Sequence, residues 1–285
     1  MASGFPAFLG VPPRMPSPKP PIARLAAVLM PVLLTLLAAT ASAAGGFLPW
    51  QDRHYIERSF YDIALNAEYA EEGVPPVIKR WVRPLRVWVY SGAGDAARQR
   101  RLLWRHLQRL GDFARLSVRL VERREEANVE VFFASDAELA GLVARELPAV
   151  ASRELPVSHC IGSIRYNQRA EIVHGTVVIP AERAQRDGKL ESCIVEEVTQ
   201  MLGLINDSRF ARHTVFSDLT DDDRLTGLDY LLIRLLYSPA LRAGMTSAEA
   251  MPRVRRQLLA WERIGLIRKA ERLVARSEGP RLAGG

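Results

Sequence analysis

The stretch from Cys193 to Asp207, CIVEEVTQMLGLIND, decides how the rest of the chain is interpreted. Apolar residues recur along it at the three- and four-residue spacing of a helix that ends at Gly203. At about 100° per residue, Glu196 lies well away from the middle of the apolar face and Gln200 lies on its flank. Glu197 lies within about 60° of that middle. Burying a carboxylate alone is costly. Glu197 therefore either lines a functional cleft or makes a structural hydrogen bond.

The same residues resemble the metal-site helix of zincin metallopeptidases, with every histidine replaced. In the pattern H-E-x-x-H-x-x-G-x-x-H the histidines hold zinc and the glutamate activates the zinc-bound water. Here Glu196, Gln200 and Asn206 stand at the three ligand positions. Glu197 stands at the glutamate and Gly203 at the glycine, so Glu197 is the best candidate for a catalytic residue. The candidate cleft residues are Glu196, Gln200, Gly203, Asn206 and Asp207.

The replaced positions argue against a bound metal. Zinc prefers imidazole and thiolate ligands, and neutral amide oxygens bind it weakly. We therefore expect no metal and no other cofactor. The alternative is a loose site for a harder divalent cation, formed by one carboxylate and two amides. His213, Asp207 or Asp218 could add a ligand to such a site.

Helical and strand patterns alternate along the chain. Helices are predicted at residues 47–72, 95–112, 136–145, 189–202, 226–237 and 248–275. Strands are predicted at residues 85–91, 117–122, 128–134 and 170–180. Because there are no repeats and no long linker, we expect one α+β domain over residues 45–277, with a small mixed sheet packed against helices. We expect a disordered tail at residues 278–285.

The first residues have the pattern of a targeting segment. Three positive charges precede an apolar run from Leu25 to Ala44, which ends in small residues. This pattern predicts a signal peptide over residues 1–43 and a periplasmic or secreted protein with no membrane span after cleavage. An uncleaved anchor helix is the alternative, since the run approaches the roughly 20 residues that span a bilayer. Pro31 within the run favours cleavage.

The two cysteines, Cys160 and Cys193, both follow this segment. In an oxidising compartment two cysteines usually pair. A bond between them would stabilise the fold by roughly 3–4 kcal/mol on the chain-entropy model. Two buried free thiols are the alternative.

The chain is basic, with a formal net charge of +7. A cluster of basic residues on the predicted helix at residues 95–112 is interpreted as a solvated face; its members are Arg98, Arg100, Arg101, Arg105 and Arg109. An exported protein meets little nucleic acid, so we expect no nucleic-acid partner and at most an attraction to anionic surfaces.

Several longer segments carry a family resemblance. They are RWVRPLRVWVY, HGTVVIP between the cysteines, EEVTQMLGLIND and LTGLDYLLIRLLYSPALRAGMT. Taken together, residues 81–252 resemble an exported proteobacterial family catalogued as domain of unknown function 2927. The resemblance implies a zincin-like fold without an assigned activity. It also implies an edge strand from Ile172 to Ile179 that can pair with an extended peptide, and a Cys160–Cys193 bridge that ties this strand's approach to the helix. Met245 is a candidate for the methionine turn of zincins.

Three functions follow from these observations. The favoured one is a non-catalytic zincin-like domain that binds a peptide or cell-envelope polymer in a former metallopeptidase cleft. The second is a metal-dependent hydrolase with oxygen ligands. The third is a structural protein that uses its basic helices.

Overall fold

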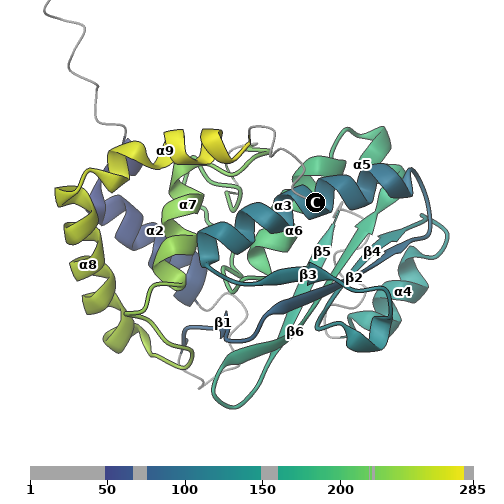
Figure 1. Cartoon of the computed structure of the whole chain (residues 1–285), viewed down its shortest axis with the longest axis horizontal. Coiled ribbons are helices and arrows are strands. Elements are labelled where there is room, and N and C mark those ends of the chain that lie inside the picture. Colours follow the sequence, from purple (N-terminus) through teal and green to yellow (C-terminus); the bar gives the residue numbers. More distant parts are fainter. Residues whose placement is uncertain (1–48, 67–75, 149–159, 218, 220–221, 279–285) are drawn as a thin grey trace, which may run out of the picture. The chain divides into compact units, whose positions relative to one another are not determined.

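One mixed sheet of six strands organises the part of the chain that the computed structural model describes, which is residues 49–66, 76–148, 160–217, 219 and 222–278 (Figure 1). Five strands, β3, β2, β4, β6 and β1, run parallel, and β5 pairs antiparallel with β6. The strands are β1 (Arg80–Trp81), β2 (Leu85–Ser91), β3 (Val118–Leu120), β4 (Val129–Ala134), β5 (Ile161–Tyr166) and β6 (Glu171–Pro180). The expected signal peptide at residues 1–43 lies outside the described residues, as does all but Glu278 of the expected tail.

The edge of the sheet next to β6 is formed by β5. Ile172 of β6 is in register with Trp81 of β1 and with Tyr166 of β5, so β1 and β5 lie on opposite sides of β6. Because β4 also pairs with β6, neither side of β6 is open. The prediction that residues 172–179 form an edge strand was therefore wrong. The actual edge strand, IGSIRY, was missed because small and polar residues interrupt its strand pattern.

The helices follow the predicted pattern with three differences. The helix predicted at residues 47–72 is shorter (Arg53–Leu65), a helix at Ala181–Arg186 was not predicted, and the last predicted helix is divided. A single helix was expected at residues 248–275, but the chain breaks at Gly265, whose φ of 69° suits glycine, and forms α8 and α9. The helices are α2 (Arg53–Leu65), α3 (Ala96–Ala114), α4 (Leu139–Glu146), α5 (Ala181–Arg186), α6 (Leu190–Gln200), α7 (Gly227–Leu236), α8 (Ser247–Arg263) and α9 (Leu266–Ser277). Two 3₁₀ turns, η1 (Pro49–Gln51) and η2 (Arg124–Glu126), complete the set.

Both faces of the sheet are covered, because successive side chains of a strand point to opposite faces. Val131 and Val177 belong to the main core, which also includes residues of α3 and α6. Phe132 and Val178 face the other way and pack with Leu142 and other residues of α4. Fully burying side chains of this size contributes about 1.5–3 kcal/mol each. The helices α2, α7, α8 and α9 pack on one another beside the sheet (Figure 1).

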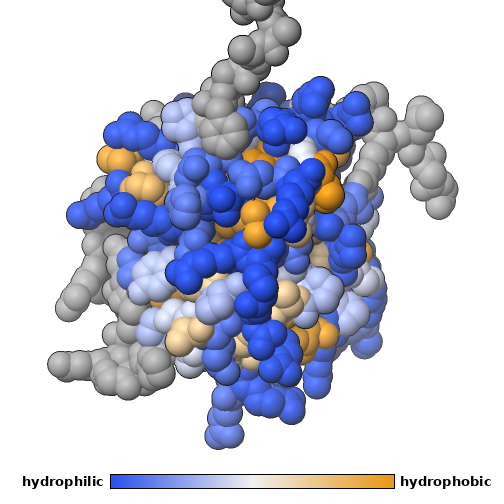
Figure 2. Space-filling model, turned by 90° about the vertical axis from the view of Figure 1, so that its left-hand side faces the viewer, coloured by the Kyte–Doolittle hydropathy of each residue, from blue (hydrophilic) through white to orange (hydrophobic). Residues whose placement is uncertain are grey.

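The face on the α8 side is mostly hydrophilic (Figure 2). Its apolar residues form small, separate groups between charged side chains, and Ile264 at the α8–α9 corner is 67% exposed. Such scattered exposure is normal for a water-facing surface. Within the described ranges, no helix combines the length and the apolar character that a bilayer crossing requires.

Candidate functional site

Helix α6 lies along the edge strand β5. At its start, Cys193 forms a disulfide with Cys160, the residue before β5, with a Cα–Cα distance of 5.7 Å. This bond confirms the predicted pairing. One turn later, Glu197 reaches the strand at Gly162. The disulfide and this contact hold the helix beside the strand.

The carboxylate of Glu197 lies between α6 and β5. The residue is 6% exposed, which confirms that it projects toward the buried side of the helix. A Cβ atom added at Gly162 would lie 2.5 Å from Oε2 of Glu197, closer than such atoms approach in proteins. Glycine at this position therefore makes the space that the carboxylate fills.

Glu196 and Gln200 lie on the more exposed side of α6. They share a helix face with Cys193 by their three- and four-residue spacing, and Cys193 is bonded to the residue before β5. The side-chain amide of Gln200 donates to Asp207 Oδ1 at 2.7 Å. The structure thus brings three candidate cleft residues to a polar strip of Glu196, Gln200 and Asp207 next to the edge strand.

The candidate Asn206 has a different place. After α6 the chain turns at Gly203, whose φ is 110° and which packs against the backbone of Lys79. Asn206 is 2% exposed, and its amide nitrogen donates to the carbonyls of Ile63 at 3.0 Å and Asn66 at 2.8 Å, at the end of α2. The idea that Asn206 converges with Glu196 and Gln200 on one point does not fit these bonds.

The residues of this site do not fit a zinc ion. In the ranges that the structure describes, there is no group of three or more histidine, cysteine, aspartate or glutamate residues that could hold a metal. His213, a possible additional ligand, is 2.9 Å from Glu271 and stacks on Trp50. Asp218 lies outside the described residues. Met245 is buried in the loop before α8, where its carbonyl accepts from the backbone of Ile78.

The far side of α6 contacts a buried histidine of α3. Nε2 of His106 lies 3.0 Å from Thr199 Oγ1, and the threonine hydroxyl donates to the carbonyl of Val195. Since the single hydroxyl proton goes to Val195, His106 is the donor to Thr199. Burial, followed by the charge of Arg109, lowers the pKa of His106 to about 3. The imidazole is neutral at pH 7 and holds α3 against α6.

The edge strand offers backbone groups to the outside. Gly175 of β6 donates its N–H to the carbonyl of Asn128, the residue before β4. Successive residues of a strand turn their backbone N–H and C=O groups to opposite sides, so His174 and Thr176 turn theirs toward β5. Their partners in β5 include Ser163 and Arg165. The residues between these partners, Gly162 and Ile164, therefore point their N–H and C=O groups away from the sheet. In the described part of the chain, no further strand pairs with this side of β5.

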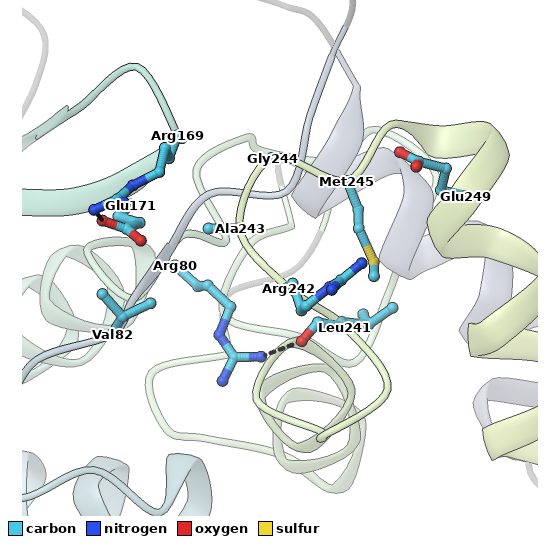
Figure 3. A pocket seen from close by; sticks show the side chains of 10 residues that line it. All are labelled: Arg80, Val82, Arg169, Glu171, Leu241, Arg242, Ala243, Gly244, Met245 and Glu249. Carbon is cyan, nitrogen blue, oxygen red and sulfur yellow. Dashed lines mark hydrogen bonds and ion pairs between the residues drawn. The ribbon is translucent and has the colours of Figure 1, made fainter.

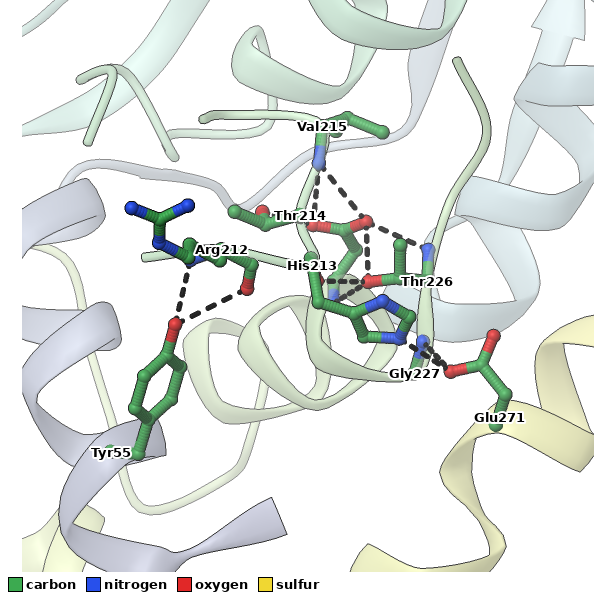
Figure 4. Close-up of polar contacts among 9 residues, drawn as sticks. Tyr55, Arg212, His213, Thr214, Val215, Thr226, Gly227 and Glu271 are labelled. Carbon is green, nitrogen blue, oxygen red and sulfur yellow. Dashed lines mark hydrogen bonds and ion pairs between the residues drawn. The ribbon is translucent and has the colours of Figure 1, made fainter. Parts of the chain in front are cut away.

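A second polar cluster lies at the start of α7 and was not predicted (Figure 4). Asp229 is fully buried and accepts from the hydroxyl of Thr214 at 2.5 Å and from the backbone of Thr226 at 2.8 Å. Burial raises its pKa to about 6, although these hydrogen bonds oppose the shift. Glu271 of α9 accepts from the backbone of Gly227 at 2.8 Å. The available signal was the T-x-x-D spacing of Thr226 and Asp229, which is typical of a capped helix start.

Comparison with known proteins identifies a family. No curated protein matches the chain. A family model described as "Protein of unknown function (DUF2927)" matches residues 53–256, which include the whole sheet, the disulfide and helix α6. The chain therefore belongs to the DUF2927 family.

Proposed function

We propose that this chain is an exported, zincin-like domain without a metal site, and that it binds an extended peptide along the outer edge of β5. The observation that carries the proposal is the outward direction of the backbone groups of Gly162 and Ile164. An extended peptide can add to such an edge as a further strand through main-chain hydrogen bonds. An envelope polymer with amide groups would use the same donors and acceptors.

The acidic side chains of the polar strip favour a peptide with positive charges. The polar strip carries the carboxylates of Glu196 and Asp207, and Glu197 lies just beneath the strand. Opposite charges would guide a basic peptide to this edge and set its register. The disulfide between Cys160 and Cys193 holds helix and strand together, which reduces the ordering that binding requires.

Binding is favoured over hydrolysis because the former ligand positions have other partners. Gln200 donates to Asp207, and Asn206 binds the carbonyls at the end of α2. The disulfide also supports export, since such bonds persist in oxidising compartments. The N-terminal sequence pattern of a signal peptide points the same way.

The test is to block the outer edge of β5 with proline, which removes one backbone donor. Ile164→Pro removes an N–H that points outward. The matched control is Leu120→Pro on β3: Val121 donates to Val87 of β2, so the N–H of the preceding Leu120 points outward at the opposite edge. Both side chains are partly buried, so neither variant replaces a fully buried side chain.

The probe is a fluorescein-labelled peptide of alternating valine and lysine, and the readout is fluorescence anisotropy, with circular dichroism to establish that each variant is folded. We expect saturable binding by the wild type and by Leu120→Pro, and none by folded Ile164→Pro. The proposal is wrong if the wild type shows no saturable binding, or if both proline variants bind equally well.

A further inference from the structure

A cationic pocket is lined by residues other than those of the polar strip (Figure 3). Its volume is about 490 Å³. Its walls come from β1, from the turn between β5 and β6, and from the loop between α7 and α8. Gly244 of that loop lies close to the carbonyl of Arg169 in the turn. The pocket therefore sits where three segments far apart in the sequence meet.

Arg80 forms the inner wall of this pocket, and its guanidinium is only partly used. Nη1 donates to the carbonyls of Leu236 at 2.9 Å, Ser238 at 3.2 Å and Leu241 at 2.9 Å, all just after or at the end of α7. These bonds fix the orientation of the side chain. Nε is buried without an acceptor, and Nη2 has no hydrogen-bond partner among the described residues.

The guanidinium of Arg80 lies over the ring of Tyr237, 4.7 Å from its centroid, but it has no anionic partner among the described residues. Within the described ranges, no carboxylate forms an ion pair with Arg80, and burial lowers the pKa of the guanidinium, with Tyr237 opposing the shift. A half-buried cation without an anionic partner is costly, because it has lost part of its hydration. An anion in the pocket would offset this cost.

The two carboxylates of the pocket are already engaged. Glu171 accepts from Asn167 at 2.8 Å and from Arg169 at 3.1 Å, and the hydrogen bond from Asn167 is the main cause of its lowered pKa. Glu249 accepts from the backbone and the hydroxyl of Thr246 at the start of α8. Neither carboxylate is directed to Arg80.

Arg242 supplies a second cation at the rim. Its side chain is exposed and forms no hydrogen bond or ion pair with another described residue. Next to it, Met245 and Leu241 are buried apolar residues, and Val82 is an apolar residue that is 53% exposed. The pocket thus combines an apolar wall with two guanidinium groups that form no ion pair with a described carboxylate.

We propose that this pocket binds an oxyanion, a phosphate or carboxylate group on a small or polymeric ligand, between Arg80 and Arg242. Guanidinium groups match both anions in charge and in hydrogen-bond geometry. The apolar part of the ligand lies on Val82 and Met245. This site is separate from the proposed peptide edge and does not depend on it.

The test uses the purified chain with inorganic phosphate in one arm and acetate in the other, and a neutral sugar as the blank. Amide chemical shifts of Gly244 and its neighbours follow the titration. Arg242→Gln removes one cation without removing a side-chain hydrogen bond or ion pair to another described residue. Arg256→Gln is the matched control, because Arg256 is an exposed arginine of α8 outside the pocket.

We expect saturable shifts at Gly244 in at least one arm, and the arm with tighter binding identifies the anion. Arg242→Gln weakens this binding by at least about tenfold, the effect of one charge-assisted hydrogen bond, and Arg256→Gln leaves it unchanged. The absence of saturable shifts in both arms would overturn the proposal. Equal weakening by the two variants would also overturn it, since that would indicate a general attraction of anions to a basic surface.

Discussion

A charged residue lies at each end of α7, Asp229 at the first turn and Arg80 of β1 at the last. The two residues differ in how many of their hydrogen bonds are made within the protein. At the first turn, Asp229 accepts hydrogen bonds from Thr214, Val215 and Thr226, three donors that are labelled in Figure 4. At the last turn, Arg80 donates from one nitrogen to three carbonyls, that of Leu241 among them (Figure 3), and two of its nitrogens have no hydrogen-bond partner among the described residues. Both charges complement the helix dipole. A buried charge whose hydrogen bonds are all made within the fold is structural, whereas one with unused donors beside a pocket indicates a ligand.

The largest effect is expected at the first turn. Asp229→Ala leaves the hydroxyl of Thr214 and the backbone N–H groups of Val215 and Thr226 without their acceptor. Each unsatisfied buried donor costs about 1–3 kcal/mol, so the free energy of unfolding should fall by about 3–5 kcal/mol. Urea denaturation measures this change. A loss below about 1 kcal/mol would show that the cluster is not structural.

A pH titration also tests the contribution of Asp229 to stability. The pKa of Asp229 is raised from 3.8 to about 6, so between these values the folded state binds more protons than the unfolded state. Its contribution to stability is complete below about pH 4 and declines as the pH rises to about 6. At about 1.4 kcal/mol per pKa unit, the decline relative to Asp229→Asn is about 2–3 kcal/mol. Urea midpoints of both proteins at several pH values measure it, and parallel profiles would contradict the assignment.

The smallest effect is expected at the last turn. Arg80→Met removes the hydrogen bonds to Leu236, Ser238 and Leu241 but also removes a half-buried charge. These two changes oppose each other, so we expect a loss of only about 1–2 kcal/mol in unfolding free energy. A larger loss of stability in Arg80→Met than in Asp229→Ala would contradict the distinction between the two residues, because Arg80 would then have a mainly structural role.

Features with a local cause were predictable from the sequence. The strand at residues 85–91 has the expected bounds, because its β-branched and aromatic run is continuous. Asp95 caps α3 by accepting from the backbone of Arg98, as such a residue before a helix should. The position of Glu197 on the buried side of α6 follows from helix geometry alone.

Features that depend on distant segments were not predictable. The edge strand β5 is specified by its pairing with β6 and not by its own composition. Asn206 follows a turn at Gly203, and beyond that turn the spacing along α6 no longer determines direction. Its partners at the end of α2 lie more than 130 positions earlier in the chain. The Arg80 pocket likewise needs three separate segments in place before its charges meet.

The bond between Cys160 and Cys193 has a consequence for maturation. A chain with two cysteines has only one possible intramolecular pairing. Oxidation of a single molecule cannot give a scrambled isomer, so no reshuffling step is required to reach the native covalent structure. An oxidant that accepts two electrons is sufficient, and a disulfide isomerase has no intramolecular error to correct.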